Sequence, residues 1–336
     1  MPTQTKTAQQ PIAHPGVDAV RAAQRAIGGV IRPTPVVQSD TLSTQCGVPV
    51  YLKLEHHQIT GSFKLRGAAH AMSRLSDDQR ARGVVGASTG NHGRGLAYAA
   101  KTAGVRCVIC MSALVPENKV AAIRALGAEV RITGQSQDEA QAEVEMLVRN
   151  AGLSMVPPFD HADVIAGQGT IGLEMLEQLP DVQTVLVQVS GGGLMSGVAA
   201  ALRATRPSGL RIVGVSMERG AAMHAALRAG RPVPVKELPT LADSLGGGIG
   251  QDNRHTFAMV RDLIDDLILV SEDEIARAIH HAYWQEKQII EGAGAVGIAA
   301  LQSGKLQPSG PTLVLLSGGN IDMALHHRLI STPHPM

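Results

Sequence analysis

Short apolar segments alternate with longer amphipathic segments along almost the whole chain. The short segments are typical of buried strands, and the long ones are typical of helices that cover a sheet. The predicted strands are residues 48–54, 83–87, 105–111, 129–133, 184–189, 211–216, 267–270 and 312–316. The predicted helices are residues 17–27, 67–75, 95–103, 118–126, 136–151, 194–205, 272–285 and 293–301. Strands joined through helices run parallel, so the pattern predicts an α/β protein with parallel sheets.

The predicted strands and helices divide into two groups. Short β-α units between residues 73 and 156 indicate a small α/β domain inserted into a larger one. The large domain is then discontinuous, with residues 1–72 and 157–336. A chain of 336 residues is long enough for such an arrangement.

Composition excludes several classes of partner. The formal net charge is +1 and aromatic residues make up 2% of the chain, which argues against nucleic acid and anionic membrane surfaces. We find no apolar run of the length that crosses a bilayer and no signal peptide. The cysteines are Cys46, Cys107 and Cys110, an odd number without a disulfide framework, which is typical of a reducing compartment. We therefore expect a cytoplasmic protein.

The segment Thr60 to Ala68 contains a single lysine, Lys64, among small residues at a predicted corner between a strand and a helix. A lysine packed into such a corner is desolvated, which lowers its pKa and makes its amine a nucleophile. The alternative is an ordinary solvated lysine at the start of a helix.

A second segment follows the predicted strand at 83–87 and opens the next helix. It contains Ser88, Thr89, Gly90, Asn91 and His92. Free backbone N–H groups at a helix N-terminus favour an anion, so this turn suits a substrate carboxylate. The alternative is a plain capping turn.

A third segment follows the strand at 184–189. It contains Ser190, Gly191, Gly192, Gly193 and Leu194, and precedes a predicted helix. Its spacing is neither the dinucleotide fingerprint nor a P-loop, so it predicts a bound phosphate without a nucleotide. The alternative is a structural glycine turn.

A fourth segment, Ser317 to Asn320, follows the strand at 312–316. Loops at the carboxyl ends of parallel strands line the ligand crevice, and Ser317 could bond a ring nitrogen without charging it. The alternative is again a plain turn. Together the segments supply an amine, two anion sites and a neutral hydrogen-bonding group. This set predicts pyridoxal phosphate held on Lys64.

These motifs resemble those of the fold-type-II pyridoxal-phosphate enzymes of the threonine dehydratase and serine racemase group. The resemblance covers residues 22–330. It implies a fold similar to the tryptophan synthase β subunit, with the cofactor in the cleft between two α/β domains. A dimer is the usual symmetric assembly of a soluble protein, so we also expect a homodimer.

The resemblance also implies roles for individual residues. Lys64 would carry the cofactor and Phe63 would pack beside its ring. Asn91 would bond the ring's 3-oxygen, and Ser317 the ring nitrogen. The phosphate would lie on Ser190, Gly191, Gly192, Gly193 and Leu194, with Ser190 in place of a common glycine. The substrate carboxylate would lie on Ser88, Thr89, Gly90, Asn91 and His92, and Glu291 matches a family glutamate near the site.

The implied activity is α,β-elimination. A β-hydroxy amino acid similar to threonine or serine would become a 2-oxo acid and ammonia, with Lys64 as general base. Residues 54–58 and 215–220 resemble those of hydroxyectoine-utilisation dehydratases, which implies a substrate from hydroxyectoine breakdown.

Two other functions stay open at this point. One is an amino-acid racemase, of the serine or aspartate type, although serine racemases have a serine where Thr89 stands. The other is a non-catalytic protein that binds a small molecule. Many relatives bind a divalent cation where this chain has Ser216 and Ala222, so we expect no metal site.

Overall fold

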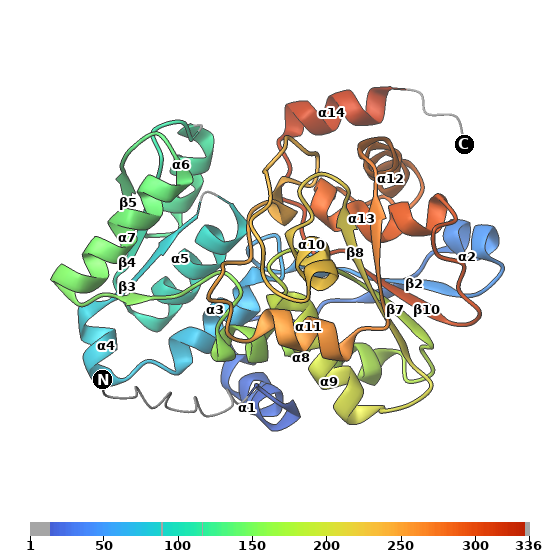
Figure 1. Cartoon of the computed structure of the whole chain (residues 1–336), viewed down its shortest axis with the longest axis horizontal. Coiled ribbons are helices and arrows are strands. Elements are labelled where there is room, and N and C mark those ends of the chain that lie inside the picture. The colour runs from blue at the N-terminus through green and yellow to red at the C-terminus, as the bar shows by residue number, and fades with distance from the viewer. Residues whose placement is uncertain (1–13, 89, 116, 333–336) are drawn as a thin grey trace, which may run out of the picture.

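The structure is a computed structural model that describes residues 14–88, 90–115 and 117–332. The chain forms two sheets that lie side by side, each covered by helices (Figure 1). Within the described residues, no helix combines the length and the apolar character needed to cross a membrane.

The larger sheet has the strand order β1-β2-β10-β7-β8-β9. Its strands are β1 (Val36–Gln38), β2 (Val50–Lys53), β7 (Thr184–Gln188), β8 (Arg211–Met217), β9 (Asp266–Val270) and β10 (Thr312–Leu315). Neighbouring strands are parallel from β2 to β9, as predicted. Strand β1, which the sequence pattern did not predict, adds an antiparallel edge. In this sheet β10 lies between β2 and β7, so the carboxyl ends of β7 and β10 are neighbours.

The smaller sheet has the order β5-β4-β3-β6 and is parallel throughout. Its strands are β3 (Val84–Ala87), β4 (Cys107–Met111), β5 (Glu129–Ile132) and β6 (Ser154–Met155). All four strands lie between residues 73 and 156. Cys107 and Cys110 are buried free thiols on β4.

Several helices concern the site. They are α3 (Lys64–Ser73), α5 (Asn91–Ala103), α8 (Ala162–Gln178), α9 (Gly193–Thr205), α11 (Thr256–Leu263) and α13 (Gly292–Gln302), with the 3-10 turns η1 (Glu55–His57) and η2 (Asp243–Leu245). The others are α1 (Val17–Ile27), α2 (Asp40–Cys46), α4 (Asp77–Arg82), α6 (Glu117–Ala125), α7 (Gln137–Ala151), α10 (Ala222–Ala229), α12 (Glu272–Trp284) and α14 (Met323–Ser331).

Helix α8 was not predicted, although it is the helix that brings α3 and α9 together. It is buried over Val164–Met175 and packs against both of them. A Cβ on Gly167 would lie 2.6 Å from the carbonyl oxygen of Arg66, and one on Gly169 would lie 2.8 Å from that of Gly197. Helix α8 is apolar on most sides and rich in glycine, so it lacks the amphipathic pattern by which helices are predicted.

A buried ion cluster lies behind α3. The Arg66 guanidinium donates to Glu55 at 2.7 and 2.9 Å and to Glu174 at 2.6 and 2.9 Å. Lys53 Nζ donates to Glu174 Oε2 at 2.6 Å and to the Thr34 carbonyl at 2.7 Å. These charges pair two cations with two carboxylates and link β2, η1, α3 and α8.

Candidate active site

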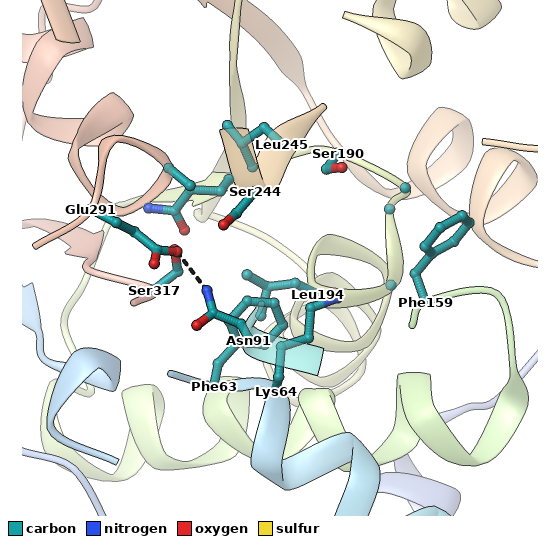
Figure 2. A pocket seen from close by; sticks show the side chains of 15 residues that line it. Phe63, Lys64, Asn91, Phe159, Ser190, Leu194, Ser244, Leu245, Glu291 and Ser317 are labelled. Carbon is teal, nitrogen blue, oxygen red and sulfur yellow. Dashed lines mark hydrogen bonds between the residues drawn. The ribbon is translucent and has the colours of Figure 1, made fainter. Parts of the chain in front are cut away.

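A cavity lies where the carboxyl ends of β7 and β10 meet the first residues of α3, α5, α9 and α13 (Figure 2). It is lined by Phe63, Lys64, Asn91, Phe159, Gln188, Ser190, Gly191, Gly192, Gly193, Leu194, Ser244, Leu245, Glu291, Ala293 and Ser317. At least one residue of each of the four predicted segments is among them.

Lys64 is the first residue of α3 and faces the cavity from its floor in Figure 2. Its Nζ donates to the Pro158 carbonyl at 2.8 Å and lies 5.3 Å from the centroid of the Phe63 ring. Burial lowers the pKa of this amine to about 8, and the negative charge of Glu291 partly opposes that effect. A useful fraction of the amine is therefore unprotonated near neutral pH, as a nucleophile requires.

Backbone hydrogen bonds join the lysine segment (residues 60–68) to the serine segment (residues 317–320). The N–H of Phe63 donates to the Ser317 carbonyl at 3.1 Å, and Ser62 forms a β-bridge with Gly318. Ser317 is buried and lines the cavity on the side of Glu291. Its hydroxyl is therefore suited to meet a polar ring atom of a ligand.

The glycine segment (residues 190–194) forms the N-terminus of α9. Gly192 is the N-cap residue, with a φ of +88°, and no side chain caps the helix. The first N–H groups of α9 are therefore available to an anion at the positive end of the helix dipole. The Phe159 side chain lies against this segment and was not predicted.

Replacing Gly193 by alanine is expected to weaken cofactor binding by about tenfold or more. The added Cβ would lie 2.8 Å from the Cα and carbonyl oxygen of Phe159, so the backbone of the anion site must move. Fluorescence titration of the apoprotein with the cofactor would measure the change. Gly29→Ala is the matched control, because a Cβ there meets open space. Equal cofactor affinity in both variants would contradict this account of the loop.

The second segment faces the cavity with only part of its predicted residues. Asn91 is among the lining residues. The Ser88 hydroxyl instead accepts the N–H groups of Gly93 and Gly90, at 3.0 and 3.3 Å. The ring of His92 bonds the Val156 carbonyl through Nε2 at 2.8 Å, and burial lowers its pKa to about 3, so the ring is neutral.

Gly90 is the N-cap residue of α5, and Thr89 lies outside the described residues. The structure therefore gives Ser88 and His92 contacts that stabilise the turn, and the substrate role of this segment stays a prediction.

Among the described residues that line the cavity, Glu291 has the acidic side chain and Lys64 the basic one. Glu291 Oε1 accepts a hydrogen bond from Asn91 Nδ2 at 2.7 Å, which is the bond drawn in Figure 2. Burial, and then the charge of Asp243, raise the pKa of this carboxyl to about 7. Glu291 can thus change its protonation state at physiological pH.

Sequence reasoning missed Phe159, Gln188, Ser244, Leu245 and Ala293. Gln188 carried a signal that could have been used, because it is a polar residue at the end of an apolar strand. Its Nε2 donates to the Leu315 carbonyl at 2.5 Å, whereas its buried Oε1 has no partner among the described residues. Phe159 is in a loop and Ser244 is in the short 3-10 turn η2, and nothing in the sequence pattern indicates that these side chains face a cavity.

The described residues contain no group of three or more histidine, cysteine, aspartate or glutamate side chains that could hold a metal ion. At the positions compared with the metal site of relatives, Ser216 is buried on β8 and Ala222 begins α10. The lining residues instead fit pyridoxal phosphate. They offer an amine for its aldehyde, an uncapped helix N-terminus for its phosphate, and an aromatic ring and a hydroxyl for its pyridine ring.

Comparison with known proteins agrees with this fit. The model of the family described as pyridoxal-phosphate dependent enzyme matches residues 27–318. A Sinorhizobium fredii protein named "Putative threonine dehydratase" is 61% identical over 93% of each chain. The L-threonine ammonia-lyase of Thermotoga maritima is 42% identical over 94% of this chain and 78% of its own. The structure of maize serine racemase superposes with a TM-score of 0.89 at 32% identity, covering 94% of this chain and 97% of its own.

The chain belongs to the pyridoxal-phosphate-dependent enzyme family. Its cofactor is pyridoxal phosphate, and its fold is that of the fold-type-II enzymes. The prediction of an ammonia-lyase of the threonine dehydratase group is confirmed at the level of enzyme class. The prediction of a non-catalytic binding protein is not supported by these relatives.

Proposed function

We propose that this enzyme converts a β-hydroxy amino acid to a 2-oxo acid and ammonia. The observation that carries the proposal is the position of Lys64, whose amine faces a cavity shared with the α9 N-terminus and Ser317. Bound pyridoxal phosphate supplies an electron sink that acidifies the α-hydrogen of an attached amino acid. The α-hydrogen and β-hydroxyl leave together as water. An equivalent of water then hydrolyses the product imine, so the net products are the 2-oxo acid and ammonia.

The residues of the chain have separate tasks in this proposal. Lys64 carries the cofactor at rest, and its free amine takes the α-proton when substrate is bound. Asn91 and the α5 N-terminus, which line or adjoin the cavity, would face the substrate carboxylate and the 3-oxygen of the cofactor ring. The α9 N-terminus would hold the phosphate, Phe63 would pack beside the ring, and Ser317 would meet the ring nitrogen.

The proposed substrates resemble threonine or serine. The names of the Sinorhizobium and Thermotoga relatives support threonine. The resemblance of residues 54–58 and 215–220 to hydroxyectoine-utilisation dehydratases supports a β-hydroxy amino acid formed during hydroxyectoine breakdown.

A racemase is the second candidate, because the maize serine racemase structure superposes over almost the whole chain. Racemisation needs a second base on the ring face opposite Lys64. Serine racemases use a serine there, and this chain has Thr89 at that position.

A substrate panel separates the two reactions. The purified holoenzyme is incubated with L-threonine, L-serine, threo-3-hydroxyaspartate and hydroxyectoine-derived amino acids, and 2-oxo acid, ammonia and optical rotation are measured together. Equal release of oxo acid and ammonia from one substrate is the expected result. Loss of rotation without release of oxo acid would replace the lyase with the racemase, and its sensitivity to Thr89→Ala would test the second base.

We also propose a cytoplasmic homodimer, with a small domain of residues 73–156 inserted into a large domain of residues 1–72 and 157–336. The dimer is proposed because it is the usual symmetric assembly of soluble proteins, and exposed apolar side chains such as Trp284, Ile289 and Met323, at 48, 41 and 57% exposure, are ones that an interface would cover. The position of the smaller sheet, whose strands all lie between residues 73 and 156, supports the division into domains. Sedimentation equilibrium would test the dimer, which a single species of 35.1 kDa would contradict.

A further inference from the structure

Three side-chain amide and carboxyl groups form a hydrogen-bonded chain that ends at the cavity. Asn320 Nδ2 donates to the Thr60 carbonyl at 2.9 Å and to Asn91 Oδ1 at 2.6 Å. Asn91 Nδ2 in turn donates to Glu291 Oε1 at 2.7 Å (Figure 2). The chain thus connects the lysine segment, the second segment and the serine segment.

The donor and acceptor of every hydrogen bond among these side chains are fixed by the bond between Asn320 and the Thr60 carbonyl. The Thr60 carbonyl can only accept, so the group of Asn320 that faces it must be the NH₂. The second hydrogen of that NH₂ goes to Asn91, so the Asn91 atom that receives it must be the oxygen. Asn91 therefore turns its own NH₂ toward Glu291. One hydrogen of this NH₂ is bonded to Glu291, and the other remains for a ligand.

The two outer members of this hydrogen-bonded row, Asn320 and Glu291, are closely packed. A Cβ on Gly61 would lie 2.6 Å from Asn320 Oδ1, and Gly61 has a φ of +77°. A Cβ on Gly318 would lie 2.7 Å from Glu291 Oε1. Backbone without side chains therefore lies directly against both outer members, which leaves them little room to rotate.

We propose that Asn320 and Glu291 are positioning residues that fix the Asn91 side chain as a hydrogen-bond donor toward the cofactor. The ligand atom that Asn91 meets must then be an acceptor, which suits the ionised 3-oxygen of pyridoxal phosphate. This inference rests on the proposed contact between Asn91 and the cofactor. Neither Asn320 nor Thr60 is among the described lining residues, so the cavity alone does not indicate them.

The test compares Asn320→Asp with Asn320→Ala. The carboxylate introduced by Asn320→Asp would face the Thr60 carbonyl and Asn91 Oδ1, two acceptors, so Asn91 is driven to flip and to present its oxygen to the cofactor. We expect the dissociation constant of the cofactor to rise by about tenfold or more, with a shifted visible absorbance maximum. Asn320→Ala only releases Asn91 and is expected to show a smaller rise, of about threefold.

The pH dependence of cofactor affinity provides a test that a merely structural role of Asn320 would not affect. Protonation of the introduced carboxyl restores one donor, so the cofactor affinity of Asn320→Asp, relative to that of Asn320→Ala, is expected to recover as the pH falls. Asn150→Asp introduces the same change at an exposed residue of α7 and controls for added charge. Thermal unfolding of each apoprotein shows whether a variant has folded, and Asn320→Ala remains informative if Asn320→Asp does not fold.

Two further variants distinguish a failure of the proposed contact between Asn91 and the cofactor from a failure of the positioning inference. Glu291→Gln keeps an acceptor for Asn91 and is expected to change cofactor affinity by less than about threefold. Asn91→Ala tests the underlying contact. If Asn91→Ala leaves affinity and spectrum unchanged, the proposed role of Asn91 is wrong. If Asn91→Ala weakens binding whereas Asn320→Asp binds as the native protein does, the positioning inference alone is overturned.

Discussion

Replacing Lys64 by alanine is expected to abolish turnover and to remove the visible absorbance of the bound cofactor. The cavity then lacks both the amine that carries the cofactor and the base that takes the α-proton. Loss of a general base alone costs about 10²–10⁴-fold in rate, and loss of covalent attachment adds to it. We therefore expect kcat to fall by at least about 10³-fold.

The control for Lys64→Ala is Lys236→Ala, which removes an exposed lysine from a loop and is expected to keep colour and rate. Activity of Lys64→Ala within about tenfold of the native enzyme would contradict the site, because no mechanism through a lysine-bound cofactor survives that substitution. Addition of a small primary amine offers a second check, since it is expected to restore part of the proton transfer.

Replacing Arg66 by methionine is expected to destabilise the folded protein strongly. Arg66 is fully buried between Glu55 and Glu174, which are 0 and 8% exposed. Methionine fills part of the volume but leaves two carboxylates facing each other without their shared cation. Breaking a buried ion pair in this way costs about 3–5 kcal/mol, which we expect as the loss in the free energy of unfolding.

Urea denaturation of the apoprotein would measure the effect of Arg66→Met. Arg149→Ala is the control, because Arg149 pairs with Glu145 at 3.7 Å on the exposed side of a helix and such pairs contribute little. A midpoint equal to that of the native protein would show that the cluster does not stabilise the fold. Lys64 is two residues from Arg66 on α3, so partial loss of cofactor affinity is expected as well.

The sequence predicted which loops meet at the cavity where the chain obeys the rules of parallel sheets. The glycine segment and Ser317 follow β7 and β10, which are neighbours in the larger sheet, so their loops meet at one edge. Lys64 joins them because the backbone of Phe63 bonds the Ser317 carbonyl. The pairing of β2 with β10 that makes this bond possible joins residues far apart in sequence, and periodicity does not reveal it.

The direction of individual side chains could not be predicted. Ser88, Asn91 and His92 lie in one turn, and successive residues of a helix point about 100° apart, so only some of them can face the same cavity. The structure directs Asn91 inward and gives Ser88 and His92 backbone partners. Phe159 follows the smaller sheet and reaches the site through the course of a loop, which leaves no periodic signal.

The central claim is that Lys64 carries pyridoxal phosphate in this cavity. It can be tested by reducing the holoenzyme with borohydride, digesting it and finding the modified peptide by mass spectrometry. We expect the reduced cofactor on the peptide that contains Lys64, and less of it there when the holoenzyme is first incubated with substrate and reduced during turnover. Modification of another lysine instead, or no covalent cofactor at all, would contradict the assignment of the site.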